Sequence, residues 1–313
     1  MEYDLGYKSF WGSMAQILPL HIEKRKKPIS VIMVSFMTGP ALHEAIRSVL
    51  RDKDIFELIL VDNGNTVAAR ESIAKMVVEN DRIRLLQGHG NIGFGRACNY
   101  GAKMARGEYF LFLNPDAIIA DGAARQLADC GKTLTEPWIA GGMLEDVNGQ
   151  EQRGGRRGRL TPLSALVSFS PLHKLPFLRS IHRERDPLPT CPEKYSTVSG
   201  ACMMMARACF EKLGGFDEKY FLHVEDIDIC KRTREAGGDV YFVPHAKVMH
   251  YGSTSQVGRH KVEWEKLKGF TRYFWDYSPS IFGKVLTTIA WPFMMLAIMG
   301  RSSLMVIRQA FRW

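Results

Sequence analysis

Residues 109–116 read Tyr109-Phe110-Leu111-Phe112-Leu113-Asn114-Pro115-Asp116, an apolar run that ends in a polar turn. An unbroken apolar run of this length is typical of a strand covered on both faces, as in parallel sheets. Open α/β sheets bind their ligands at the carboxyl edge of the strands. We therefore expect Asp116 at a binding edge, where its carboxylate would suit a cation that bridges a diphosphate.

The segments around this run alternate between strand and helix patterns. Expected strands occupy residues 29–34, 57–61 and 83–86, and expected helices occupy 41–50, 68–79 and 97–105. An apolar stretch at 201–206 and a strand at 239–244 would complete the sheet. This alternation predicts an α/β fold with a doubly wound, mainly parallel central sheet and helices on both faces.

The domain organisation follows from where this alternation begins and fails. Residues 1–27 form a leader with a basic end at 24–27, and the α/β domain spans 28–255. Within it, the glycine- and proline-rich segment 149–192 predicts an irregular or mobile insert. Its basic side chains either close over a phosphate or an acceptor, or belong to a solvated loop. These side chains are Arg153, Arg156, Arg157 and Arg159.

The last region, 256–313, is expected to be helical and apolar in its centre. Residues 285–299 carry no formal charge and contain Pro292. They fall short of the ~20 apolar residues of a spanning helix, so an interfacial or re-entrant membrane segment is expected. A core helix or a dimer helix is the equally weighted alternative.

Bulk properties limit the function classes. The chain has 313 residues and a formal net charge of +9, which allows anionic partners such as phosphorylated substrates or anionic lipid. Its six cysteines form no CxxC pair, which favours a reducing cytoplasm over a disulfide framework or a zinc site. Glu2 and Asp4 stand where a signal peptide would be basic, so export is not expected. A nucleic-acid-binding protein is disfavoured because no aromatic-basic recognition pattern is present.

A second acidic group, Glu225-Asp226-Ile227-Asp228, opens an expected helix. The helix dipole favours ionised carboxylates in a first turn, and an ionised carboxylate could take a proton from an attacking hydroxyl. Asp228 and Arg232 have the i,i+4 spacing of an ion pair on one helical face. A merely charged first turn is the alternative without catalysis.

Several segments now occur in an order that resembles family 2 glycosyltransferases, especially the rhamnosyltransferase-like branch of bacterial surface polysaccharide synthesis. The resemblance covers roughly 29–255 and implies a GT-A fold, a nucleotide-sugar donor, a divalent cation and inversion at the anomeric carbon. The segments that carry it are Val31-Ile32-Met33-Val34-Ser35-Phe36, Val61-Asp62-Asn63-Gly64, Asn91-Ile92-Gly93-Phe94-Gly95-Arg96-Ala97-Cys98-Asn99-Tyr100-Gly101, Leu113-Asn114-Pro115-Asp116-Ala117, Gly214-Gly215-Phe216-Asp217 and Glu225-Asp226-Ile227-Asp228-Ile229-Cys230.

The resemblance also assigns roles to single residues. Asp226 would be the catalytic base, and Glu225 would orient the acceptor. Asp116 and His250 would hold Mn²⁺ or Mg²⁺, although a lone histidine is as often a core or surface residue. Gly200 and Arg156 are placed on the acceptor side. The donor nucleotide would contact Ser35, Asp62, Asn63, Gly93, Phe94, Asn99, Asn114 and Asp116.

Alternatives stay open for three of the donor residues. The Asp62-Asn63-Gly64 sequence also fits an Asx-turn, in which Asp62 only caps the backbone. The glycines around Phe94 could bring backbone amides to a pyrophosphate at a helix N-terminus, or simply form a turn. Asn99 either holds this loop or touches the donor.

The sequence thus predicts an inverting transferase that moves a sugar from a nucleotide-sugar donor to a glycan or lipid-linked glycan. Rhamnose is the favoured sugar, and the donor would be dTDP-rhamnose or a UDP-sugar. It would act in the cytoplasm, peripherally at the inner face of the plasma membrane, and a homo-oligomer is compatible with it. The competing interpretation is a non-catalytic nucleotide- or glycan-binding partner, because Asn114 replaces the first acid of the D-x-D motif.

Overall fold

The computed structural model describes residues 28–169, 175, 179–252, 254, 255 and 257–310. The predicted leader with its basic end at 24–27 lies outside the described residues, as do 170–174 and 176–178 of the predicted insert. The first described element is a strand at Ile29–Ser35, where the sequence predicts the first strand.

The first half of the chain forms the parallel part of the sheet, in the order β3-β2-β1-β4. These elements lie where the sequence predicts them, apart from a few residues at their ends. The helix predicted at 97–105 begins three residues earlier, at Phe94. The strands are β1 (Ile29–Ser35), β2 (Ile55–Asp62), β3 (Ile83–Leu86) and β4 (Tyr109–Leu113), and the helices are α1 (Ala41–Arg51), α2 (Val67–Glu79) and α3 (Phe94–Met104).

The second half makes the sheet mixed. Strand β10 (Cys202–Ala206) lies antiparallel between β4 and β6 (Trp138–Glu145), and β11 (Asp239–His250) then runs parallel to β6. The short strands β5 (Ala117–Ile119) and β8 (Glu193–Lys194) pair antiparallel with β11, which gives a nine-stranded sheet. The α/β fold with a central sheet is confirmed.

Strand β11 is longer than the predicted strand 239–244. It continues through Pro244 to His250, because its pairing with β6 shifts register between Val243 and Lys247. A bulge of this kind accommodates a proline, which cannot donate a ladder hydrogen bond. The extension carries His250 to the end of β4, beside Asn114 and Asp116.

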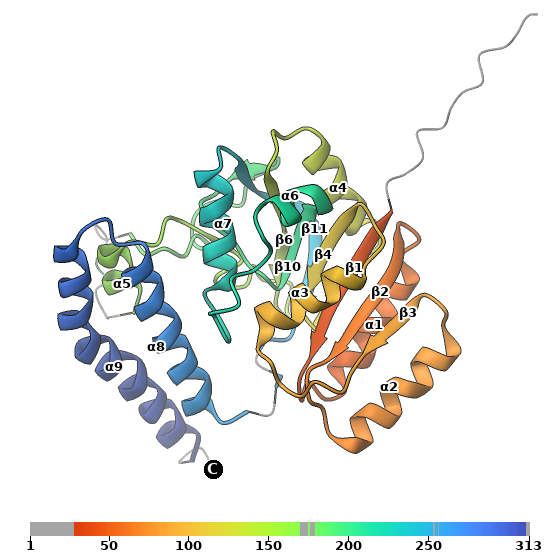
Figure 1. Ribbon diagram of the computed structural model, residues 1–313, viewed down its shortest axis with the longest axis horizontal. Helices are drawn as coiled ribbons and strands as arrows, with labels where there is room; N and C mark the ends of the chain where they lie inside the picture. Colours follow the sequence, from red (N-terminus) through yellow and green to blue (C-terminus); the bar gives the residue numbers. More distant parts are fainter. Residues whose placement is uncertain (1–27, 170–174, 176–178, 253, 256, 311–313) are drawn as a thin grey trace, which may run out of the picture.

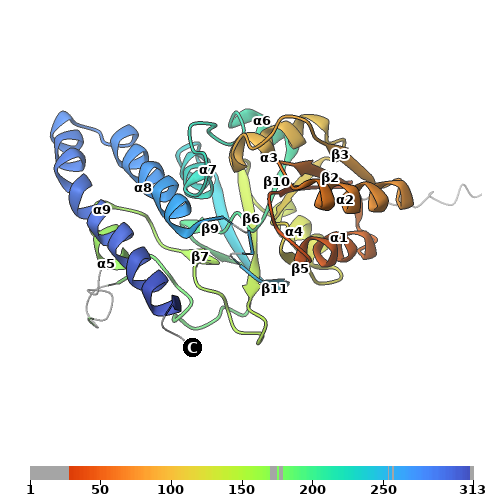
Figure 2. The same cartoon turned by 90° about the horizontal axis from the view of Figure 1, so that it is seen from below.

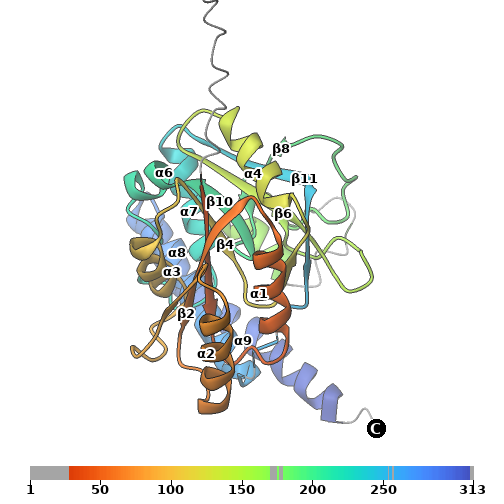
Figure 3. The same cartoon turned by 90° about the vertical axis from the view of Figure 1, so that its right-hand side faces the viewer.

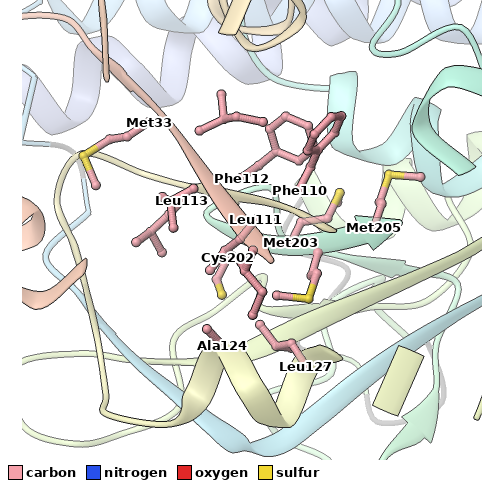
Figure 4. Packing of buried hydrophobic residues seen from close by; sticks show 14 of the residues in the cluster. Met33, Phe110, Leu111, Phe112, Leu113, Ala124, Leu127, Cys202, Met203 and Met205 are labelled. Carbon is pink, nitrogen blue, oxygen red and sulfur yellow. The ribbon is translucent and has the colours of Figure 1, made fainter. Parts of the chain in front are cut away.

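Helices cover both faces of the sheet (Figures 2 and 3). On one face lie α3, α6 (Arg207–Lys212) and α7 (Glu225–Glu235), and on the other lie α1 and α4 (Ala123–Lys132). Side chains of β4 alternate between these layers, and Figure 4 shows Phe110, Leu111, Phe112 and Leu113 within the packed core. The Phe112 ring meets that of Phe216 edge-on at 4.9 Å, and this contact ties β4 to the segment that leads into α7.

The predicted insert is partly regular. It contains β7 (Arg156–Arg157), which pairs with β9 (Thr197–Val198), and helix α5 (Pro162–Phe169). The glycine and proline content had suggested an irregular or mobile segment. A strand of two residues is too short to show a periodic pattern in the sequence. Its stability also depends on distant residues: Arg156, for example, donates a hydrogen bond to the carbonyl of Pro187, 31 positions later.

The C-terminal region folds back on itself as a hairpin of α8 (Arg259–Asp276) and α9 (Ile281–Ala310) (Figure 1). It packs through a second apolar cluster, in which Leu267 and Phe270 of α8 meet Val224 and Ile227 at the start of α7. Pro292 lies inside α9. Among the described residues, no helix combines the length and the hydropathy that a membrane crossing requires.

Candidate active site

Ser35 and Asp62 lie opposite each other at the carboxyl ends of β1 and β2. Asp62 Oδ1 accepts hydrogen bonds from the backbone nitrogens of Gly64 and Asn65, at 3.1 and 2.8 Å. The side-chain nitrogen of Asn65, Nδ2, also donates to Asp62 Oδ1 at 2.8 Å and to the Ser35 carbonyl at 3.1 Å. The Asx-turn weighed for Asp62 is therefore present. It makes the edge rigid at the place where a donor nucleotide is expected.

Asn63 joins the end of β2 to the loop before α3. Its Oδ1 accepts a bond from the Ile92 nitrogen at 3.1 Å, and its Nδ2 donates to Asn91 Oδ1 at 3.1 Å. The side chain is buried. Asn63 is thus a tie between two loops at the sheet edge.

The loop at Gly93 and Phe94 differs from the prediction of amides that face a pyrophosphate. The Gly93 nitrogen donates to Asn91 Oδ1 at 3.1 Å, and the Phe94 nitrogen donates to the Phe221 carbonyl at 2.8 Å. A Cβ at Gly93, whose φ is 91°, would lie 2.8 Å from that carbonyl oxygen. These two amides are therefore already bonded to protein, and the loop requires glycine for a close approach to the 216–223 segment.

Asn99 holds the same segment from the next turn of α3. Its Nδ2 donates to the Phe216 carbonyl at 2.8 Å, and its Oδ1 accepts from the Phe216 nitrogen at 2.9 Å. Of the two roles considered for Asn99, the structure favours holding the loop, because both ends of the amide are occupied.

Asp116 and His250 meet at the ends of β4 and β11, with Asp116 Oδ1 3.1 Å from His250 Nε2. Gln152 Nε2 donates to the His250 carbonyl at 3.2 Å, which turns Gln152 Oε1 toward His250 Nδ1 at 2.6 Å. Nδ1 therefore carries a proton. Nε2 donates to Asp116 Oδ1 when the ring is protonated; without that second proton, its lone pair faces Asp116 and is available to a cation. Such an outer hydrogen bond at Nδ1 is typical of a histidine that ligates a metal.

Two further side chains complete this corner. Thr254 Oγ1 donates to Asp116 Oδ2 at 2.9 Å, and Asn114 Nδ2 lies 3.2 Å from His250 Nε2. Burial raises the pKa of the Asp116 carboxyl, but the hydrogen bond and charge of His250, together with the Thr254 hydroxyl, outweigh it and hold the pKa below its usual value. Asp116 is consequently ionised at neutral pH.

The donor set of one carboxylate and one imidazole fits a divalent cation such as Mn²⁺. In the part of the chain that the structure describes, no group of three or more His, Cys, Asp and Glu side chains is arranged to hold a metal. Asp116 and His250 would thus supply two ligands and leave the other positions to phosphate oxygens and water, as is usual for hard cations in phosphate sites.

Asp226, in the first turn of α7, lies next to this corner through a short backbone path. The Gly200 nitrogen donates to Asp226 Oδ2 at 3.1 Å, and the next residue, Ala201, accepts a bond from the Asn114 nitrogen at 2.9 Å. A Cβ at Gly200 would lie 3.3 Å from that of Asp226. The Asp226 side chain is 15% exposed, so the carboxylate remains open on one side.

Two groups next to Asp226 in the sequence, Glu225 and His223, have strongly shifted pKa values. Burial, and secondarily the Asp226 charge, raise the pKa of Glu225 to about 8, and Glu225 Oε2 has no hydrogen-bond partner among the described residues. Burial and the Lys266 charge lower the pKa of His223 to about 3, so the ring is neutral. Glu225 is thus a buried carboxyl with a raised pKa beside the partly open carboxylate of Asp226.

Asp228, two positions further along α7, is structural. Its carboxylate lies 2.7 Å from Arg232 Nη2 and accepts a bond from the Tyr277 hydroxyl at 2.6 Å. The ion pair predicted between Asp228 and Arg232 is confirmed.

Arg156 does not lie where an acceptor-side residue is expected. Its side chain is 0% exposed, and its guanidinium is fully used by Glu151 at 2.7 Å, the Tyr195 hydroxyl at 2.6 Å and the carbonyls of Asp186 and Pro187. The acceptor-side prediction for Arg156 is therefore wrong. Its neighbour Arg157 points to the opposite side of the short strand and forms the ion pair with Asp226.

Comparison with known proteins agrees with this geometry. Residues 30–214 match the model for "Glycosyl transferase family 2", and 181–261 match that for "N-terminal domain of galactosyltransferase". An N-acetylglucosaminyl-diphospho-decaprenol L-rhamnosyltransferase of Mycobacterium tuberculosis is 28% identical over 72% of this chain and 77% of its own. The rhamnosyltransferase WbbL of Escherichia coli is 23% identical over 71% and 83%, respectively.

Solved structures share the fold. One is GalNAc-T7, crystallised with UDP, GalNAc and Mn²⁺, with a TM-score of 0.56 and 17% identity over 81% of this chain and 52% of its own. Another is Staphylococcus aureus TarS in complex with UDP-GlcNAc, with a TM-score of 0.51 and 14% identity over 86% and 73%. The fold is that of the GT-A glycosyltransferases. The chain belongs to glycosyltransferase family 2 and is a glycosyltransferase similar to rhamnosyltransferases.

Proposed function

We propose that this glycosyltransferase inverts the anomeric centre of the sugar that it transfers, with Asp226 as general base. The observation that carries the proposal is the placement of a partly open carboxylate, through Gly200 and Ala201, directly beside the Asn114–Asp116 turn. A base and a diphosphate-binding corner at one sheet edge are the two groups that a single displacement requires.

The proposed sugar transfer is a single displacement at the anomeric carbon. Asp226 accepts the proton of an acceptor hydroxyl while that oxygen forms a bond to the anomeric carbon from the face opposite the leaving group. The bond from the anomeric carbon to the phosphate oxygen breaks, and the nucleoside diphosphate departs with the electron pair. Asp116 and His250 would hold a divalent cation, Mn²⁺ or Mg²⁺, which supplies charge neutralisation for the departing diphosphate.

For the substrates, we infer dTDP-rhamnose as the best donor, with a UDP-sugar as the other choice, and a lipid-linked glycan as the acceptor. The similarity to the mycobacterial N-acetylglucosaminyl-diphospho-decaprenol L-rhamnosyltransferase supports this inference. Ser35, Asp62 and Asn63 would face the nucleotide. The side-chain amide of Asn114 contacts His250. An amide at this position, where the D-x-D motif has its first acid, is therefore compatible with cation binding by Asp116 and His250.

A lipid-linked acceptor requires access to a membrane surface, and α9 offers a suitable face. Its apolar side chains Ile281, Ile289, Phe293 and Leu296 are 83%, 59%, 70% and 71% exposed. They recur at helical spacing, so they share one side of α9, whose other side packs Trp291 and Met295 against the second apolar cluster. We propose that this side lies in the inner face of the plasma membrane, with the catalytic domain in the cytoplasm. Pairing of two copies through the same side is the alternative.

The test combines binding and transfer. Calorimetry with dTDP, UDP and GDP, with Mn²⁺ or Mg²⁺ and again with chelator, should give metal-dependent binding of one nucleotide. The matching nucleotide-sugar should then be transferred to a GlcNAc-diphospho-polyprenol, with inversion seen by NMR of the product. Retention of anomeric configuration, or turnover that is indifferent to chelator, would remove the respective part of the proposal.

A further inference from the structure

The side chain of Arg157 is held against Asp226 from a different part of the chain. Arg157 Nη2 forms the ion pair with Asp226 Oδ2 and also donates to the Val198 carbonyl at 3.1 Å. The two side chains are 12% and 15% exposed. The guanidinium is thus anchored at one point of the backbone and directs a charge at the carboxylate.

The short strand that carries Arg157 is held firmly in place. Strand β7 pairs antiparallel with β9, with Arg157 opposite Thr197 and Arg156 opposite Val198 (Figure 2). The preceding residue, Arg156, is completely buried in its ion pair with Glu151. Because a buried charge pair is costly to separate, β7 is fixed in place and Arg157 with it.

Asp226 is surrounded by several titratable groups. Glu225 and Asp228 belong to the same helix, His223 precedes it, Lys266 approaches from α8 and Cys98 faces Glu225 from α3. Lys266 is paired with Glu263 at 3.1 Å. Arg157 is therefore the cation in direct contact with Asp226 in the described part of the chain.

The other bonds of Asp226 fix its orientation. Oδ2 also accepts from the Gly200 nitrogen at 3.1 Å, and Oδ1 accepts from the Ile227 nitrogen at 2.7 Å. Each carboxylate oxygen has a second lone pair, so the acceptor hydroxyl can still approach. Without the Arg157 guanidinium, Asp226 would keep its two backbone donors but would have no positive charge to offset the buried Glu225 carboxyl beside it. Two close carboxyls compete for a proton.

We propose that Arg157 is a positioning residue for the catalytic base: it keeps Asp226 ionised beside a second carboxyl and locks it in one orientation toward the acceptor. This inference rests on the proposed function, in which Asp226 removes the acceptor proton. It replaces Arg156 by Arg157 as the arginine that matters on the acceptor side, and it assigns Arg157 no contact with the donor.

Arg157→Gln and Arg157→Lys test the proposal, with Arg185→Gln as the control because Arg185 is an exposed arginine of the same 149–192 segment to which no role is assigned. The readout is kcat against pH in the transfer assay above, together with KM for the donor. We expect Arg157→Gln to lower kcat at pH 7 by about 10- to 100-fold, below the full worth of a general base. Its acid limb should move up by about one pH unit or more, while the donor KM stays unchanged.

Arg157→Lys keeps the charge but not the guanidinium fork. It should retain the acid limb of the wild type and lose part of kcat, whereas Arg185→Gln should match the wild type in both. An unchanged kcat and acid limb in Arg157→Gln would overturn the proposal. If that variant does not fold, an unchanged kcat in Arg157→Lys would overturn it instead. Normal turnover in Asp226→Asn is a separate outcome, because it would reject the proposed function itself.

Discussion

Replacement of Asp226 by asparagine separates the chemical step from substrate binding. The carboxylate has donors on both oxygens: Arg157 and the Gly200 nitrogen at Oδ2, and the Ile227 nitrogen at Oδ1. An amide of the same size has only one acceptor oxygen, so one side must face a donor with an NH₂ group. The variant loses the basic group, one hydrogen bond and the partner charge of a largely buried arginine.

The magnitudes follow from these losses. Removing a general base lowers turnover by about 10²- to 10⁴-fold, which is about 3 to 5 kcal/mol of activation free energy. The lost hydrogen bond and the unpaired guanidinium should reduce the free energy of unfolding by about 1 to 3 kcal/mol. Metal-dependent nucleotide binding should be unchanged, because Asp116 and His250 keep their contacts with each other.

The assay compares wild type, Asp226→Asn and the control Asp129→Asn. Asp129 lies on α4, on the opposite face of the sheet, where its ion pairs with Arg125 and Lys132 are exposed and worth little. Initial rates of sugar transfer, thermal unfolding and calorimetry of nucleotide binding are measured on all three proteins. Turnover of Asp226→Asn within about tenfold of wild type would refute the assignment of the base. Loss of nucleotide binding would show instead that the carboxylate belongs to the donor site.

Three further predictions concern the cation, the buried acid and the membrane face. Asp116→Ala should abolish the Mn²⁺-dependent part of nucleotide binding in calorimetry, and equal affinity with and without chelator in the wild type would contradict this. Burial, assisted by Asp226, raises the pKa of Glu225 from 4.5 to about 8, so its neutral form stabilises the fold below pH 4.5 and this contribution is lost as the pH rises to 8. Glu225→Gln should therefore gain stability relative to wild type between pH 5 and pH 8 in thermal unfolding, and an equal difference at both pH values would count against it. The double variant Ile289→Asp/Phe293→Asp should lose sedimentation with phosphatidylglycerol vesicles but keep nucleotide binding, whereas Val78→Asp on α2, also an exposed apolar site, should still sediment.

The parallel half of the sheet could be predicted from sequence because each of its strands is a short apolar run followed by a helix. Strand β6 was not predicted. It contains Gly141, where a Cβ would lie 2.4 Å from that of Val198. The need for glycine at this position comes from a strand more than fifty residues later, and such a demand leaves no local pattern. The same reasoning applies to β5, whose three residues form a strand only by pairing with β11.

Prediction of the site was limited in the same way. Asp116 and Asp226 stand at the ends of elements, where position alone suggests a role. By contrast, Gln152 acts on a histidine 98 positions away, and Arg157 acts on a carboxylate 69 positions away. Their sequence neighbourhood, rich in glycine and arginine, indicates only a loop. The choice between Arg156 and Arg157 depends on which side of a two-residue strand faces α7, and no period can be read from two residues.

The C-terminal hairpin supports the turn that carries the proposed base, and it also carries the proposed membrane face. His223 and Val224 have φ angles of 63° and 73°, and this left-handed conformation is costly for a β-branched residue, about 1 to 3 kcal/mol. The cost is offset because Val224 is buried against α8, where Gly269 leaves just enough room: a Cβ there would lie 3.0 Å from Val224 Cγ2. The bond from the Tyr277 hydroxyl to Asp228 ties the end of α8 to α7 as well. The strained turn that presents Glu225 and Asp226 is thus held in place by α8, which also packs against α9, the helix of the proposed membrane face. The orientation of the proposed base and the proposed attachment to a membrane therefore share one structural support.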